Sequence, residues 1–400
     1  MTAIPIPAEL IGQLYYWVTF LICVFTYFSY TGSGGCDKLM TKNSMVPALI
    51  LISIVIIIIG LRPVHHAFGD TVNYANSYAL IRPVFGEINF SKEWLFGTYT
   101  VWCKSMGFSV NMYFLFIGIG YFGMMFMAYK KALWENAWFA MLFALSAFST
   151  LSYGVNGLRN GLACSITTLA IVFAAKDKNF IISGLLCFLA SGVHKSTMLP
   201  IAAMVGALFF IKKPKIALVF WMMSIPLSLA AGGPLSNLLM SMGFDDRADQ
   251  YMSANGIEAG TSVGKTGFRW DFLLYSAMPV WLMWTIQKKI NQKRSEMGIE
   301  KTPEEEESGV YGAGILADAQ SMRVYNVLST IYLLTNAFWV IVIKANFSNR
   351  FAYLSWFLYP LVIAYPVIRL HIWEDQDRKA GQILIAHAGF TIVMHILGKV

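Results

Sequence analysis

The feature that most constrains this chain is the recurrence of apolar stretches, each close to the length of a membrane-spanning helix. About twelve such stretches follow one another along the sequence. A helix rises 1.5 Å per residue, so about 20 apolar residues cross the hydrocarbon core of a bilayer. We therefore predict an all-α, polytopic integral membrane protein with about 12 transmembrane helices, which form a single transmembrane domain over residues 1–400.

The composition excludes an ordinary water-soluble protein. Only 13% of the residues are charged and 57% are hydrophobic, whereas a soluble domain has roughly 25% charged residues. The net charge of +8 does not require nucleic acid as a partner, because membrane proteins gather Lys and Arg on their cytoplasmic side. The five cysteines are scattered and form no C-x-x-C pair, which argues against a disulfide framework and against zinc. The first apolar stretch has no basic region before it, so we expect a retained helix and no signal peptide.

Hydropathy predicts where the helices lie, with ends accurate to about 2–4 residues. The predicted spans are 9–30, 45–61, 110–129, 137–155, 160–175, 180–193, 197–211, 216–231, 269–287, 323–344, 351–370 and 382–397. Two longer polar segments, 62–109 and 232–268, interrupt them. Both segments are too mixed in character to span a membrane and too long to be simple turns.

The distribution of basic residues predicts the orientation, since Lys and Arg are enriched in short cytoplasmic connections. The basic residues of alternate connections fall on one side: Lys38, Lys42, Lys130, Lys131, Lys176, Lys178, Lys212, Lys213, Lys215, the cluster 288–294, Arg369, Arg378 and Lys379. This side should be cytoplasmic, together with the loop 288–322, whose acidic run indicates a solvated segment. The segments 62–109 and 232–268 and both termini are then predicted on the outer face.

The first candidate group on the outer face begins at Asp70. Asp70, Tyr74 and Tyr78 recur every four residues and would share one face of a short helix. Asp is a preferred N-cap, so Asp70 could serve only to satisfy the first amides of that helix. Alternatively, Asp70 acts as a base or orients one.

The second candidate group is the turn Asn156-Gly157-Leu158-Arg159-Asn160-Gly161 between two predicted spans. Snorkelling to the interface explains an Arg at a span end, but a cation in the first turn of a helix faces the positive end of the helix dipole. A bound anion would reverse that disadvantage. A phosphate is suitable, because helix N-termini bind anions and a guanidinium binds phosphate oxygens bidentately.

The third candidate is His194, which lies in a tight turn between two apolar runs. A histidine in such a turn is more often a hydrogen-bonded interfacial residue than a catalyst. His194 nevertheless shares the outer face with Arg159, and histidine titrates near neutral pH, which suits proton transfer.

Two further outer segments carry candidate ligand-binding residues. Arg350 opens a predicted helix after a short turn, so the dipole argument made for Arg159 applies to it as well. Arg269 and Trp270 lie at the end of segment 232–268, where charged and aromatic residues mix. This mixture suits sugar stacking and hydroxyl hydrogen bonds, but it equally suits any folded outer loop.

These residues carry a family resemblance. Gly69-Asp70-Thr71 with Tyr74, then Asn156 to Gly161, then His194-Lys195-Ser196, in this order, resemble the EpsG-like branch of Wzy-type polysaccharide polymerases. The resemblance covers roughly residues 60 to 210 by motif and the rest by hydropathy. It implies a bacterial plasma-membrane glycosyltransferase that joins oligosaccharide repeat units carried on undecaprenyl diphosphate at the outer face. A chain-length regulator and a flippase would be partners, and nucleic acid would not.

Such a reaction needs positive charge on the departing diphosphate and a base for the acceptor hydroxyl. We expect His194 or Asp70 as the base, Arg159 as a further catalytic group, and no metal or other cofactor. The expected diphosphate-binding residues are Arg159, Arg350 and Arg269, and the expected sugar-binding residues are Tyr74, Tyr78, Asn156, Asn160 and Trp270.

Three other classes of protein fit parts of the pattern. A flippase for the same lipid-linked sugar would place polar groups near the bilayer midplane and would often show repeated halves, and this sequence shows little of either. A ligase that moves finished polymer to another acceptor would use nearly the same chemistry, and the sequence does not separate it from a polymerase. A membrane acyltransferase is a more distant alternative.

Overall fold

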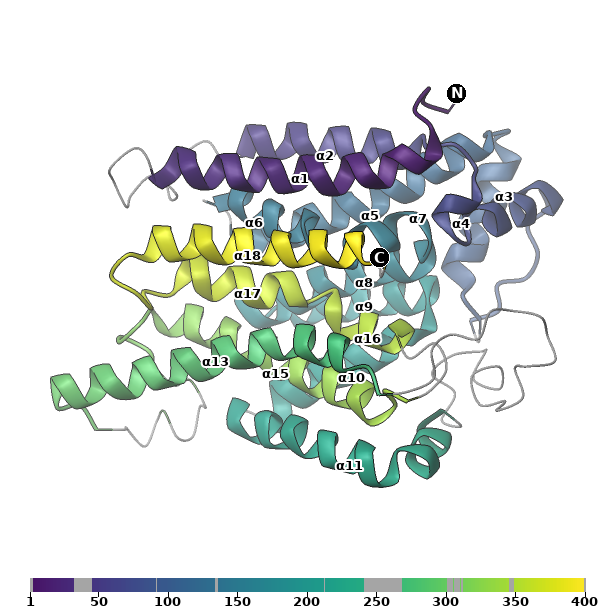
Figure 1. Ribbon diagram of the computed structural model, residues 1–400. Helices are drawn as coiled ribbons and strands as arrows, with labels where there is room; N and C mark the ends of the chain where they lie inside the picture. The colour runs from purple at the N-terminus through teal and green to yellow at the C-terminus, as the bar shows by residue number, and fades with distance from the viewer. Residues whose placement is uncertain are drawn as a thin grey trace. The chain divides into compact units, whose positions relative to one another are not determined.

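The computed structural model describes residues 3–31, 45–90, 92–133, 136–211, 213–240, 268–300, 305, 310, 312–344 and 349–398 (Figure 1). The chain divides into two compact units, one formed by residues 1–194 with 364–400 and the other by residues 195–363. The described residues form helices and no named strand, apart from an isolated bridge between Ala313 and Ala317. The prediction of an all-α fold is confirmed, whereas the single domain over 1–400 stays a prediction.

The first unit is built around a core of buried aromatic and aliphatic side chains. Its helices are α1 (Ala8–Thr31), α2 (Met45–Gly60), α3 (Thr71–Leu80), α4 (Trp94–Ser105), α5 (Val110–Ala132), α6 (Ala137–Leu145), α7 (Thr150–Val155), α8 (Leu158–Val172), α9 (Phe180–Val193) and α18 (Gln376–Ile396). A π-helical turn, Phe173–Asp177, extends α8. Helix α8 packs against α5 and α9, and α1 lies along α18.

The second unit is organised around one central helix. It contains α10 (Met198–Val205) with a π-helical extension to Phe210, α11 (Pro214–Met240), α13 (Trp270–Met297), α15 (Ala319–Ile341), α16 (Asn349–Trp356) and the first part of α17 (Tyr359–Arg369). Helix α15 contacts α10, α11, α13 and α16.

A buried polar network crosses the second unit around Asn336 of α15. Its amide donates to the hydroxyls of Ser276 (3.1 Å) and Ser355 (2.9 Å), and its carbonyl accepts from the indole of Trp221 at 2.7 Å. The indole of Trp356 donates to the same Ser276 hydroxyl at 2.8 Å. Every polar atom of the Asn336 side chain is therefore satisfied, which is what a polar residue needs in an apolar interior.

Several helices are suited to crossing a membrane. Five are long and apolar enough: Ala8–Ser29, Val110–Ala132, Leu158–Asp177, Ala319–Ile341 and Arg350–Arg369. Four shorter apolar helices lie at Met45–Gly60, Phe180–Val193, Lys195–Phe210 and Pro214–Ala230. The chain is therefore a multi-pass membrane protein, and the number of twelve spans stays a prediction.

Two predicted spans are each divided in the structure. Within 137–155, α6 ends at Leu145 and α7 begins at Thr150, and the hydroxyls of Ser146 and Thr150 each donate to a helix carbonyl at 2.6 Å. Small hydroxyl side chains can satisfy a broken helix end without lowering the hydropathy, so the sequence pattern did not reveal this break. Within 351–370, the chain divides into α16 and α17 at residues 357 and 358.

The polar segments agree with the prediction in part. Segment 62–109 contains α3, which confirms the short helix predicted from Asp70 to Tyr78, and it also contains α4, which was not predicted. Helix α13 continues past the predicted span end at 287 into the first part of the predicted loop 288–322. Of segment 232–268, the structure describes α11 up to Met240 and residues 268 onward, while residues 241–267 lie outside the described part.

Helices α5 and α8 run in the same direction, and their basic ends meet. Lys131, near the end of α5, forms an ion pair with Asp177 at the end of the α8 extension, and Lys176 donates to the Lys131 carbonyl at 2.7 Å. These predicted cytoplasmic lysines thus lie together. Arg159 lies at the opposite end of α8, in its first turn.

Candidate active site

At the Arg159 end of α8, opposite the end where Lys131 and Lys176 meet, a carboxylate joins a guanidinium and an imidazole. Glu93 Oε2 accepts a hydrogen bond from Arg159 Nη1, and Glu93 Oε1 is hydrogen-bonded to His194 Nδ1. The contact between Arg159 and Glu93 is an ion pair, and the contact between His194 and Glu93 is one when His194 is protonated. The structure thus brings Arg159 and His194, two separate candidates predicted on the same outer face, to one carboxylate.

Three helix ends place these side chains. Glu93 immediately precedes α4, Arg159 lies in the first turn of α8, and His194 caps the end of α9. Helices α8 and α9 are joined by a sharp turn in which Lys178 adopts a left-handed conformation with φ of 54°. Because α9 then packs back along α8, its last residue returns to the level at which α8 begins.

The approach of α4 to α9 depends on a glycine. A Cβ atom added to Gly192 would lie 2.6 Å from the indole nitrogen of Trp94, closer than side chains tolerate. Trp94 directly follows Glu93. The absence of a side chain at Gly192 therefore lets the start of α4 come close enough for Glu93 to reach His194.

Partial burial strengthens the electrostatics of this cluster. The side chains of Glu93, His194 and Arg159 are 15%, 18% and 29% exposed. Burial alone would raise the pKa of the Glu93 carboxyl, but the hydrogen bond and charge of His194, together with those of Arg159, lower it below its ordinary value. Glu93 is therefore an ionised acceptor at neutral pH.

An aromatic surface supports the guanidinium of Arg159. Its Nε donates to the hydroxyl of Tyr74 at 3.4 Å, and its Cζ lies 5.9 Å from the ring centre of Tyr74 and 6.0 Å from that of Phe96. These distances fit cation–π contacts. Tyr74, predicted as a sugar ligand, thus lies at the site and contacts Arg159.

Asp70 and Asn156 lock the start of α3 against the α7–α8 turn. The Asp70 amide donates to Asn156 Oδ1 at 2.8 Å, and the Asp70 carboxylate accepts from Asn73 at 3.1 Å. The Asp70 side chain makes no hydrogen bond to the amides of α3, which contradicts the alternative that it serves only as a side-chain N-cap. Among the described residues, no ion pair links Asp70 to Arg159 or His194, and its role as the base stays a prediction.

Arg62 reinforces the same junction from inside, although nothing in its sequence context marks it as a functional candidate. Its side chain is fully buried and donates to the carbonyls of Ile59 (2.6 Å) and Val155 (3.1 Å) and to the Thr71 hydroxyl (2.9 Å). Thr71 in turn donates to the Val155 carbonyl at 2.6 Å. One buried guanidinium therefore connects the ends of α2 and α7 with the start of α3.

Two of the predicted sugar ligands have structural contacts. Tyr78 is buried, its ring stacks on Tyr113 with centroids 4.5 Å apart, and its hydroxyl donates to the Phe108 carbonyl at 2.7 Å. Asn160 accepts a hydrogen bond from Cys164 one turn along α8 at 3.2 Å. Sugar binding by these two residues stays a prediction.

The remaining predicted ligands belong to the second unit. Arg269 forms a bidentate pair with Asp271, at 3.0 and 2.8 Å, and its guanidinium stacks on Phe272. Trp270 is exposed and begins α13. Arg350 is partly buried in the first turn of α16. Their predicted contacts with diphosphate or sugar stay predictions.

Glu93 is a functional candidate that the sequence pattern does not reveal. Segment 62–109 contains three carboxylates, Asp70, Glu87 and Glu93, and its sequence alone does not show which of them reaches the Arg159 turn. One usable signal was the position of Glu93 directly before an aromatic-rich helical run that starts at Trp94.

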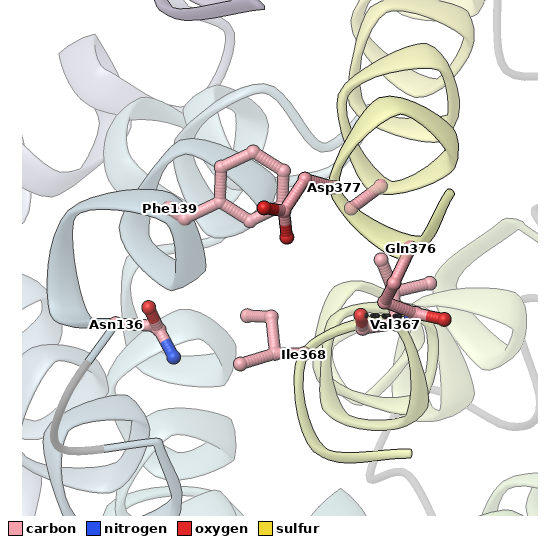
Figure 2. Close-up of a pocket in the computed structure, with 7 residues that line it drawn as sticks. Asn136, Phe139, Val367, Ile368, Gln376 and Asp377 are labelled. Atoms are coloured by element: carbon pink, nitrogen blue, oxygen red, sulfur yellow. Dashed lines mark hydrogen bonds between the residues drawn. The ribbon is translucent and has the colours of Figure 1, made fainter. Parts of the chain in front are cut away.

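A small pocket also occurs elsewhere in the first unit, and it contains none of these residues. Figure 2 shows it between Asn136 and Phe139 on one side and Val367, Ile368 and Gln376 on the other. The Gln376 amide donates to the Val367 carbonyl at 2.6 Å and so closes the turn before α18. This arrangement indicates helix-end stabilisation.

Comparison with known proteins supports the resemblance found in the sequence. The sequence model of the EpsG family matches residues 45–398, a region that extends well beyond the motifs between about residues 60 and 210. No curated protein and no solved structure matches the chain.

Proposed function

The chain belongs to the EpsG family, and on this premise we propose that it is a polysaccharide polymerase. It joins oligosaccharide repeat units carried on undecaprenyl diphosphate into surface polysaccharide such as O-antigen, capsule or exopolysaccharide. The reaction takes place at the outer face of the bacterial plasma membrane. The observation that carries the proposal is the bridge made by Glu93 between Arg159 and His194.

His194 is the proposed base. A carboxylate accepts hydrogen bonds, so Glu93 favours the tautomer in which His194 Nδ1 carries the proton and Nε2 carries the lone pair. Nε2 then takes the proton of the acceptor hydroxyl. Glu93 acts through His194, as an orienting residue whose lowered pKa keeps it ionised.

Arg159 is the proposed ligand of the leaving group. As the acceptor oxygen bonds to the anomeric carbon of the donor sugar, the bond from that carbon to the diphosphate oxygen breaks, and lipid diphosphate departs with the electron pair. A guanidinium near this oxygen stabilises the developing charge, so the step needs no metal ion. Arg350 and Arg269 would add positive charge, while Tyr74, Tyr78, Asn156, Asn160 and Trp270 would contact sugar.

The arrangement of charges supports an outer-face location. Arg159 lies at one end of α8, and Lys176, which contacts Lys131, lies at the other. Basic residues that gather at one end of adjacent spans favour that end as cytoplasmic. We therefore propose the twelve-span topology with the Glu93 cluster facing outward.

The proposal is tested in a strain that lacks the gene, complemented with variants of equal membrane abundance. Arg159→Ala and His194→Ala should abolish the long-chain polysaccharide ladder on a gel while the single-unit product remains. Arg82→Ala and His66→Ala are the matched controls, because they remove an arginine and a histidine at exposed positions of segment 62–109, and they should leave the ladder unchanged. A deletion strain that loses the single-unit product as well would indicate a flippase, and a full ladder in both site variants would refute the site.

A further inference from the structure

An exposed aromatic cluster lies next to the Glu93 site. The rings of Phe90, Trp94 and Phe188 form a triangle with centroid distances of 5.2 Å for Phe90 to Trp94, 5.3 Å for Trp94 to Phe188 and 6.3 Å for Phe90 to Phe188. Phe90 is 64% exposed and Phe188 is 51% exposed. Helix α9 is one of the apolar helices suited to crossing a membrane, so rings this exposed face lipid chains, either those of the bilayer or the chain of a bound lipid.

This aromatic cluster continues along one face of α9. Ile181, Leu185 and Phe188 are all exposed and recur at intervals of four and three residues, so they share one face of the helix. From Ile181 to Phe188 the helix rises about 10 Å. The result is an apolar track that runs along α9 and ends at the aromatic cluster.

The track ends where the charged cluster begins. Trp94 directly follows Glu93, and its indole lies against Gly192, two residues before His194. Glu93 in turn contacts Arg159. A molecule with an anionic head at Arg159 would therefore have the aromatic rings next to its head and the α9 track beside its tail.

We infer that Phe90, Trp94 and Phe188 form the binding site for the polyisoprenoid chain of the lipid-linked substrate, with the chain continuing along Ile181 and Leu185. This inference rests on the proposed function for the identity of the substrate. Flat aromatic rings suit a polyisoprenoid, because its planar double bonds and methyl branches pack on ring faces. The substrate has an anionic diphosphate followed by an apolar chain, and the protein has the charged cluster at Arg159 followed by the apolar track along α9.

The test uses the full-length protein purified in detergent and the variants Phe90→Ala and Phe188→Ala. Phe210→Ala is the matched control, because it removes an exposed ring from another helix. Native mass spectrometry measures binding of undecaprenyl diphosphate, of inorganic diphosphate, which has no tail, and of phosphatidylglycerol. We expect each of the two cluster variants to bind undecaprenyl diphosphate about fivefold to tenfold more weakly, as partial loss of one ring's burial implies. Inorganic diphosphate should bind them unchanged, and Phe210→Ala should behave as the wild type.

Three results would overturn the inference. Undecaprenyl diphosphate could bind both variants as tightly as the wild type, both variants could lose inorganic diphosphate to the same extent, or phosphatidylglycerol could show the same dependence on the rings. Because these measurements need no polymer formation, they separate the two proposals. Ring-dependent binding without polymerase activity would leave the lipid site standing and refute the polymerase.

Discussion

Replacing Glu93 by Gln is the sharpest perturbation of the site, because it keeps the shape and removes the charge. The carboxylate accepts one hydrogen bond at each oxygen, from Arg159 and from His194. An amide has only one accepting atom. If its oxygen faces His194, its NH2 group opposes the donor of Arg159. If its oxygen faces Arg159, the NH2 group makes His194 Nδ1 an acceptor and moves the imidazole proton to Nε2, which disables the base.

The magnitude follows from the two hydrogen bonds that the Glu93 carboxylate accepts. A hydrogen bond to a charged group contributes about 1.5–3 kcal/mol, and a positioned base contributes about 10²–10⁴ in rate. We expect Glu93→Gln to lower the polymerisation rate by about 10²–10⁴ through the base, and to destabilise the folded protein by about 2–3 kcal/mol, since the amide cannot replace at least one of these charge-assisted bonds.

The assay follows polymer formation from lipid-linked repeat units by the purified protein, next to the ladder formed in cells. Glu87→Gln is the matched control, since Glu87 is an exposed glutamate of the same segment. It should retain the wild-type rate. If Glu93→Gln, at wild-type abundance, polymerises within about threefold of the Glu87→Gln rate, a base oriented by Glu93 contributes far less than a positioned base should, and the reasoning fails.

Three further outcomes are expected. Because the pKa of Glu93 is lowered in the folded protein, its pairing stabilises the fold above the ordinary pKa of 4.5, and this stabilisation is lost as the pH falls through the lower folded pKa. The difference in Tm between the wild type and Glu93→Gln should therefore be largest near neutral pH and should close below pH 4.5. A difference that widens in acid would contradict this. Gly192→Ala should displace Trp94, lower the free energy of unfolding by about 1–3 kcal/mol and reduce polymer formation. The control Gly184→Ala lies on the same helix with no atom near its added methyl group, so it should change neither thermal unfolding nor the ladder, and equal effects of the two variants would exclude the steric explanation. Asn336→Ala leaves Trp221, Ser276 and Ser355 without their hydrogen bonds to Asn336, and it should lower the free energy of unfolding by about 2–4 kcal/mol in a denaturation assay. An unchanged Tm would show that this network does not hold its helices together.

The sequence predicted the helices of this protein better than their interruptions. Hydropathy located α9 at its observed limits and α5 nearly so, because both are continuous apolar runs with polar flanks. It missed the break between α6 and α7, since Ser146 and Thr150 compensate for it with hydrogen bonds that hydropathy does not register. A pattern of residue types reports burial in lipid or protein, and it does not report where backbone carbonyls find their donors.

The site was predicted in part for a similar reason. Arg159 and His194 could be recognised because each interrupts an apolar run, where a charged or titratable residue is unusual. Glu93 could not be distinguished from Glu87, because both lie in a polar segment where carboxylates are common. Only the folding of α4 against α9 through Gly192 selects one of them.

The bridge at Glu93 has a consequence for the charge of the site during a reaction cycle. With a neutral imidazole, Glu93 and Arg159 cancel, so the resting cluster holds no net charge in a partly buried place, which limits its desolvation penalty. In the proposed reaction, His194 gains a proton as the lipid diphosphate gains a negative charge. The cluster therefore becomes cationic only while there is a newly formed anion to hold, and it returns to neutrality when His194 releases its proton, which would ease departure of the lipid product.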